Sequence, residues 1–150
     1  FLLNYHQIIE LLSILYLFHA RVPERRTKFL FRSIAGVYSA VWLVNKFFYE
    51  DPERFSEGIT IAAMLFLMAA SVIVLNMIVR TSTEPATHHA SFWIALAVLL
   101  YGAGTVIITG YSNTILAMGM TAFDIFWHIN WGFTVITNIF YARSFLCRSF

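Results

Sequence analysis

Long apolar runs separated by short polar links make up the pattern of this chain. Each run has, or nearly has, the roughly 20 residues that a helix needs to cross the hydrocarbon core of a bilayer. The runs do not alternate apolar and polar residues as barrel strands do, and a helix satisfies its own backbone in lipid. The pattern therefore predicts an all-α polytopic bundle, one transmembrane domain over 1–150, with about five spanning helices at residues 2–20, 28–49, 58–79, 91–111 and 121–142.

The links between the runs carry the signals that end helices. All three prolines, Pro23, Pro52 and Pro85, lie in links, where a missing backbone N–H is tolerated. The stretch SNTILAMGM, residues 112–120, leaves three interpretations open. It is compatible with a loop, a short re-entrant piece or an early start of the fifth helix.

Positive charges predict the orientation, because cytoplasmic links of membrane proteins are enriched in Lys and Arg. The second link is mostly acidic, whereas the first link, the third link and the C-terminal end contain Arg21, Arg25, Arg26, Lys28, Arg80, Arg143 and Arg148. This alternation predicts an N-out, C-in chain. The chain starts with Phe1 and shows no signal-peptide pattern, so we expect it to begin inside a longer protein.

The composition agrees with a membrane environment. Hydrophobic residues make up 59% of the 150 residues and charged residues 12%, whereas roughly a quarter are charged in soluble domains. A soluble fold of this size exposes much of its surface and could not hide so much apolar area. The net charge of +2 gives no indication of a nucleic-acid partner. We therefore expect the lipid bilayer itself to be the main partner.

The fifth run has two distinct faces at helical spacing. We expect the more polar face to look into the bundle, because buried ionisable groups in a bilayer usually face the interior and pair. That face contains Asp124, Trp127, His128, Asn130, Trp131, Thr134, Thr137, Asn138 and Tyr141. The opposite face, which we expect to contact lipid, contains Ile125, Ile129, Phe133, Ile136 and Phe140.

Ionisable residues in other runs lie at a similar depth and predict a polar cluster in the outer half of the bundle. Lys46 is level with Asp124, so these two side chains are expected to pair, and Glu10 is expected to share a proton or hydrogen bond with His128. The predicted ligand or proton cluster consists of His6, Glu10, Lys46, Asp124, His128, Asn130 and Asn138. Its alternative role is structural, since buried polar side chains also hold helices together. A third interpretation has these residues facing water or a partner subunit.

Candidate chemistry beyond this cluster is sparse. The sequence contains none of the HExxH, GxSxG, P-loop or GxGxxG patterns, so we predict no catalytic residues and no enzyme. No metal site is predicted. A minority hypothesis has His6 and His128 as ligands of a tetrapyrrole, either a haem or a chlorophyll-type pigment. Otherwise the cofactor is left unknown.

The last two apolar runs resemble segments of a known group of membrane proteins. The segments SFWIALAVLLYGAGTVII and FDIFWHINWGFTVITNIFYARSFL, within residues 91–147, resemble the C-terminal half of small uncharacterised bacterial multi-pass membrane proteins. Those proteins are similar to the seven-helix sensory membrane regions that accompany histidine kinases. The resemblance implies a bacterial inner (cytoplasmic) membrane and a signalling protein as a partner.

The leading hypothesis is a non-enzymatic integral membrane protein, a sensory or regulatory module whose outer-half cluster binds a small ligand, a lipid or a proton. The alternative is an accessory subunit of a larger respiratory or photosynthetic membrane complex. In that alternative the polar face of the fifth helix contacts other membrane subunits or a pigment.

Overall fold

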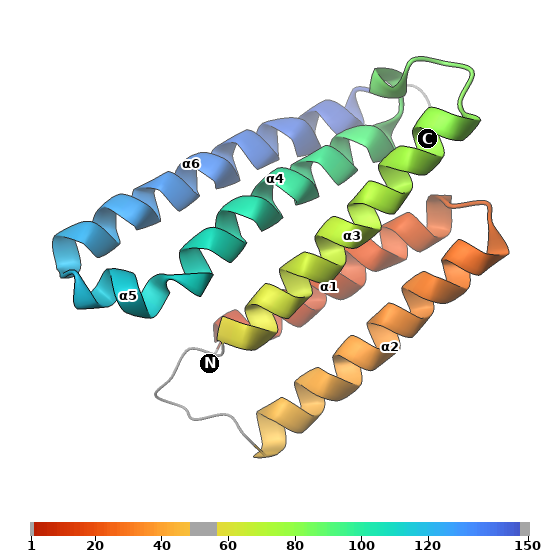
Figure 1. The fold of residues 1–150 in the computed structure, drawn as a ribbon. Coiled ribbons are helices and arrows are strands. Elements are labelled where there is room, and N and C mark those ends of the chain that lie inside the picture. Colours follow the sequence, from red (N-terminus) through yellow and green to blue (C-terminus); the bar gives the residue numbers. More distant parts are fainter. Residues whose placement is uncertain (1, 49–56, 148–150) are drawn as a thin grey trace.

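The structure is a computed structural model that describes residues 2–48 and 57–147. Its elements over these residues are all helical, which confirms the predicted all-α class (Figure 1). They are α1 (Leu2–Arg21), α2 (Arg25–Phe48), α3 (Glu57–Thr81), the 3-10 helix η1 (Ala86–His88), α4 (Ala90–Gly110), α5 (Ser112–Ala117) and α6 (Met120–Phe145).

Each apolar run coincides with one long helix. The largest differences in boundaries are that α2 begins at Arg25 rather than at residue 28, and that α6 ends at Phe145 rather than at residue 142. The Glu24 carbonyl accepts a hydrogen bond from the Lys28 N–H at 3.0 Å, so α2 starts directly after the link that contains Pro23. The positive charge of Arg143 in the last turn of α6 favours a helix C-terminus there.

The stretch 112–120 forms the short helix α5 followed by a turn into α6. Gly119 makes that turn with a φ of 105°, a backbone conformation that residues with a side chain rarely adopt. The interpretation of this stretch as an early start of the fifth helix is therefore wrong, because α5 is a separate short helix between α4 and α6. The turn at Gly119 separates α5 from α6.

The long helices form an antiparallel bundle in which α4 lies between α3 and α6 (Figure 1). α4 packs extensively against α3 on one side and α6 on the other, while α1 packs against α2 and α3. As a result, α2 and α6 lie at opposite sides of the molecule (Figure 1).

Two glycines of α4 explain how closely this helix packs against α3 and α6. A Cβ atom on Gly102 would lie 2.8 Å from Cγ of Met68 on α3, and one on Gly104 would lie 2.7 Å from Cδ2 of Phe133 on α6. Both neighbours therefore rest directly on the α4 backbone. Small residues commonly allow such close approach between membrane helices, where apolar burial gives little driving force.

Among the described residues, two helices are long and apolar enough to cross a membrane, Gly58–Thr81 within α3 and Ala90–Gly110. Five spanning helices were expected, and only these two of the described helices meet this measure. The other long helices contain more polar side chains within their length, for example Arg32 and Lys46 in α2 and Asp124 and His128 in α6.

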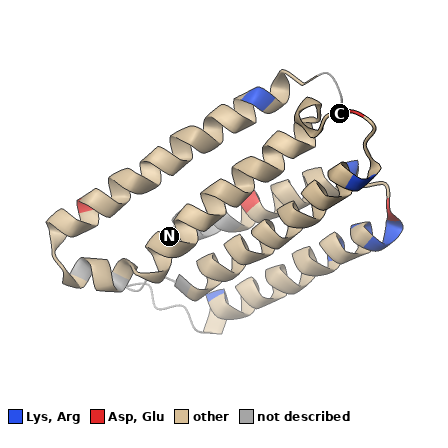
Figure 2. Cartoon of the chain, turned by 45° about the horizontal axis from the view of Figure 1, so that its top comes forward, with Lys and Arg blue, Asp and Glu red and all other residues tan. Residues whose placement is uncertain are grey.

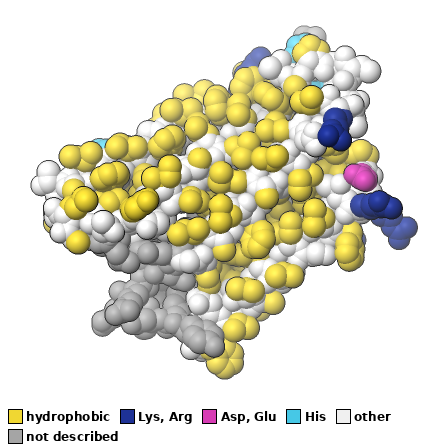
Figure 3. Space-filling view, in the orientation of Figure 1, with side chains coloured by type: hydrophobic (Ala, Val, Ile, Leu, Met, Phe, Trp, Pro, Cys, Tyr) yellow, Lys and Arg dark blue, Asp and Glu magenta, His cyan; other side chains and the backbone are white. Residues whose placement is uncertain are grey.

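The face of the bundle that Figure 3 shows is largely apolar between its two ends. Large hydrophobic side chains in the middle of several helices stay exposed, among them Val37 on α2, Val72 on α3 and Ile139 on α6, with exposed fractions of 59%, 54% and 59%. Contiguous apolar patches of this kind are rare on soluble monomers and mark contact with a membrane or a partner.

Candidate functional site

The structure corrects the predicted inward face of α6. Asp124 and His128 are exposed, as are Trp127, Trp131 and Asn138. The imidazole of His128 donates from Nδ1 to the backbone carbonyl of Asp124 at 2.6 Å, a bond within its own helix. At about 100° per residue, this exposed set is centred roughly 110° around the helix from the side of α6 that contacts α4.

The inward side of α6 is instead set by residues from Asn130 onward. Thr137 and Ser144 are buried, and Asn130, Phe133 and Tyr141 are half-buried. Phe133, expected on the lipid side, rests on Gly104 of α4. The inward placement of Asn130, Thr134, Thr137 and Tyr141 is therefore confirmed, and that of the exposed residues is wrong, namely Asp124, Trp127, His128, Trp131 and Asn138. The physical reason is that the contact of Phe133 with Gly104 places a less polar side of α6 against α4.

The expected pairs are not brought together. Lys46 and Asp124 are on α2 and α6, which the other helices keep at opposite sides of the bundle (Figure 1). The Glu10–His128 pair also fails, because His128 lies on the exposed side of α6.

The structure does not support the hypothesis that His6 and His128 together ligate a tetrapyrrole. The side chain of His6 lies outside the described residues, and His128 does not face the interior of the bundle. Among the described residues, no three His, Cys, Asp or Glu side chains gather closely enough to hold a metal ion.

Glu10 has different neighbours from those expected. It is half-buried on α1, and its charge acts on the phenolic hydroxyls of Tyr101 on α4 and Tyr141 on α6. Both tyrosine side chains pack against the hydrophobic core. We call Glu10, Tyr101 and Tyr141 the Glu10–tyrosine cluster. Its members come from three helices and supply one carboxyl group and two phenols, groups that can hold or pass a proton.

Two buried hydroxyls lie one helical turn from these tyrosines. Thr105 follows Tyr101 by four residues, and Thr137 precedes Tyr141 by four. The Thr105 hydroxyl interacts with that of Tyr101, whereas Oγ1 of Thr137 is buried without a hydrogen-bond partner among the described residues, as is Oδ1 of Asn130. Such unsatisfied atoms are costly, and each marks a place where a small polar guest would gain hydrogen bonds. The polar side chains of α6 that do reach the interior of the bundle are therefore mainly Thr134, Thr137 and Tyr141.

Positive charge is concentrated at one end of the bundle, where α1, α3 and α6 finish and α2 and α4 begin (Figure 2). We call it the basic end. Its cations include Arg21, Arg25, Arg26, Lys28, Arg80 and Arg143, and its acids include Glu24 and Glu84.

Aromatic and hydrogen-bonding contacts hold the basic end together. The guanidinium of Arg143 lies 5.8 Å from the centre of the Trp93 ring, and Trp93 Nε1 donates to the Thr87 carbonyl at 2.8 Å. These contacts connect the end of α6 to the start of α4 and to η1. Lys46 and Asp124 lie toward the opposite end.

Comparison of the chain with protein-family models, curated proteins and solved structures found no match. The functional assignment therefore depends on the residues and their arrangement.

Proposed function

We propose that this protein is a non-enzymatic integral membrane protein of the bacterial inner membrane, a sensory or regulatory module in which all five long helices cross the bilayer. The apolar surface between the ends of the bundle supports this assignment. The concentration of Lys and Arg at one end supports an N-out, C-in orientation with the basic end in the cytoplasm. The resemblance of residues 91–147 to sensory membrane regions is in line with it.

The observation that carries the regulatory role is the Glu10–tyrosine cluster. A carboxyl group within a bilayer-spanning bundle is costly when ionised and is a default candidate for function. Binding or release of a proton by Glu10 changes its interaction with Tyr101 and Tyr141, which belong to two other helices. The relative position of α1, α4 and α6 then depends on the protonation state of one side chain.

Spin-label distances across the cluster test this proposal. In a Cys147→Ser background, labels at the exposed positions Tyr16 on α1 and Ile139 on α6 report the separation of the two helices. We expect the distance distribution to change between acidic and neutral pH, and Glu10→Gln, which keeps the shape but cannot ionise, to abolish the change.

The matched control is Glu24→Gln, which removes an exposed carboxyl group at the basic end and should leave the response intact. Thermal unfolding of each variant checks that the bundle is preserved. A response that is the same in Glu10→Gln as in the native chain would contradict the proposal.

The second candidate function is an accessory subunit of a larger respiratory or photosynthetic membrane complex. It is favoured by the exposed face of α6, where Asp124, His128 and Asn138 would meet lipid in an isolated bundle at a considerable cost. Trp127 and Trp131 on the same face are residue types common in protein interfaces. Co-purification with other subunits in mild detergent supports this function, and a visible absorption band would identify a bound pigment.

A further inference from the structure

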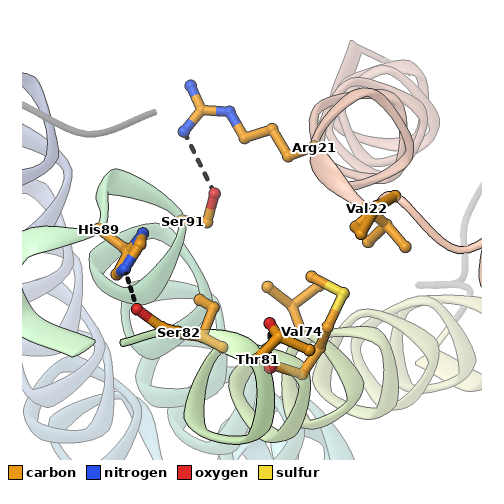
Figure 4. A pocket seen from close by; sticks show the side chains of 10 residues that line it. Arg21, Val22, Val74, Thr81, Ser82, His89 and Ser91 are labelled. Carbon is orange, nitrogen blue, oxygen red and sulfur yellow. Dashed lines mark hydrogen bonds between the residues drawn. The ribbon is translucent and has the colours of Figure 1, made fainter. Parts of the chain in front are cut away.

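A small pocket opens at the basic end, between the end of α1, the end of α3 and the start of α4 (Figure 4). Its volume is about 200 Å³. Typical pockets for drug-sized ligands are about 300–1,000 Å³, so this one suits a small chemical group rather than a whole large ligand.

Polar side chains from the three helices and the α3–α4 link converge on the pocket. Arg21 extends from α1, and its Nη1 donates to Oγ of Ser91 on α4 at 3.3 Å. Across the pocket Oγ of Ser82 lies 2.6 Å from Nε2 of His89, in a hydrogen bond between the α3–α4 link and the residue that precedes α4. Thr81 adds a further hydroxyl.

The described side chains that line the pocket carry positive charge and no negative charge. Arg21 contributes a permanent positive charge, and of the described residues that line the pocket none carries a carboxylate. His89 makes no side-chain cap to α4, so the first backbone N–H groups of that helix also favour an anion. The remaining lining is apolar and includes Val22, Val74 and Ile78.

We propose that this pocket binds a phosphate group. The planar fork of the Arg21 guanidinium matches two phosphate oxygens, and the hydroxyl of Ser91, which accepts from Arg21, can donate to a third. The same chemistry is presented by free phosphate and by the headgroup of an anionic phospholipid. The apolar lining suits the lipid, whose glycerol and upper acyl carbons would contact Val74 and Ile78. Placement of the pocket at headgroup depth rests on the orientation proposed above, but binding of the phosphate group does not.

Binding measurements on the full chain in nonionic detergent test the proposal. The probes are inorganic phosphate, short-chain phosphatidic acid and the matching diacylglycerol, which lacks the phosphate. We expect phosphatidic acid to bind and Arg21→Gln to weaken its binding about tenfold or more, as expected for loss of charge-assisted hydrogen bonds. Arg26→Gln is the matched control, because Arg26 is exposed at the same end but does not line the pocket.

The outcomes of these measurements distinguish free phosphate from a phospholipid headgroup as the ligand. If inorganic phosphate binds and depends on Arg21, free phosphate suffices as the ligand, whereas binding of phosphatidic acid alone identifies a lipid headgroup. The proposal is overturned if diacylglycerol binds as well as phosphatidic acid, or if Arg26→Gln weakens binding as much as Arg21→Gln. Arg21→Lys keeps the charge and guards against a folding defect, and it should bind more weakly than the native chain because an ammonium lacks the fork.

Discussion

At the scale of single residues, the contact between α4 and α6 contains polar atoms that the bundle leaves without partners. Among the described residues, Asn130 and Thr137 each bury one such atom. A buried unsatisfied group costs about 1–3 kcal/mol, so these positions lower the stability of the bundle unless something else occupies them. Thr137 lies one helical turn from Tyr141 and is therefore close to the Glu10–tyrosine cluster.

Thr137→Val tests whether the hydroxyl of Thr137 is unsatisfied. Removing it should leave the free energy of unfolding unchanged or raise it by up to about 1 kcal/mol, because no hydrogen bond is lost. Thr134→Val is the control, since the Thr134 hydroxyl donates to the Asn130 carbonyl at 3.0 Å and its loss should destabilise. Denaturant unfolding in detergent measures both. An equal loss of stability in the two variants would show that Thr137 has a partner.

At the scale of the helices, α4 is the element against which its neighbours are positioned. Its glycines receive Met68 from α3 and Phe133 from α6, and these two contacts come from different sides of the helix. A methionine side chain is flexible and adapts to a change of shape, whereas an aromatic ring is rigid. The two contacts should therefore differ in how well they tolerate an added methyl group.

We expect Gly104→Ala to destabilise the bundle by about 1–3 kcal/mol, the usual cost of overpacking, because its Cβ would clash with the Phe133 ring. Gly102→Ala should cost less, since Met68 can move. Gly132→Ala on α6 is the control: nothing lies within 4 Å of its Cβ position, and alanine favours the helix. Thermal unfolding ranks the three variants. A Gly104→Ala variant as stable as Gly132→Ala would refute the close contact, and Phe133→Leu should partly rescue a true clash.

At the scale of the whole molecule, the arrangement of charge and apolar surface predicts a fixed orientation in the membrane. The basic end should face the cytoplasm and the end that carries α5 should face outward, because Lys and Arg are retained on the cytoplasmic side. The exposed apolar side chains between the two ends should contact lipid.

Single cysteines in the Cys147→Ser background test this orientation with a membrane-impermeant maleimide. Thr114→Cys on α5 should be labelled in intact spheroplasts, whereas Thr83→Cys in the α3–α4 link should be labelled only after permeabilisation; both positions are exposed. Val37→Cys, in the middle of α2, should resist labelling in either case. Labelling of Thr114→Cys and Thr83→Cys from the same side would rule out the proposed topology.

The positions of the helices could be predicted from the sequence alone. Apolar runs of spanning length, prolines in the links and the alternation of charged links are local properties, so they survive whatever the helices pack against. For this reason the long helices coincide with the predicted runs to within a few residues. The short helix α5 was less predictable, because its boundary depends on the single turn at Gly119.

The neighbours of each side chain were decided only by the tertiary structure. The periodicity of α6 shows that it has two faces, but a rotation about its axis costs little until a particular contact such as Phe133 on Gly104 selects one side. The order of helices in the bundle likewise separates Lys46 from Asp124. Arg21, which lines the proposed phosphate pocket, is about 70 residues distant in the chain from Ser91, and no spacing in the sequence marks their contact in advance. The sequence by itself therefore determined where helices form, whereas packing determined which polar residues meet.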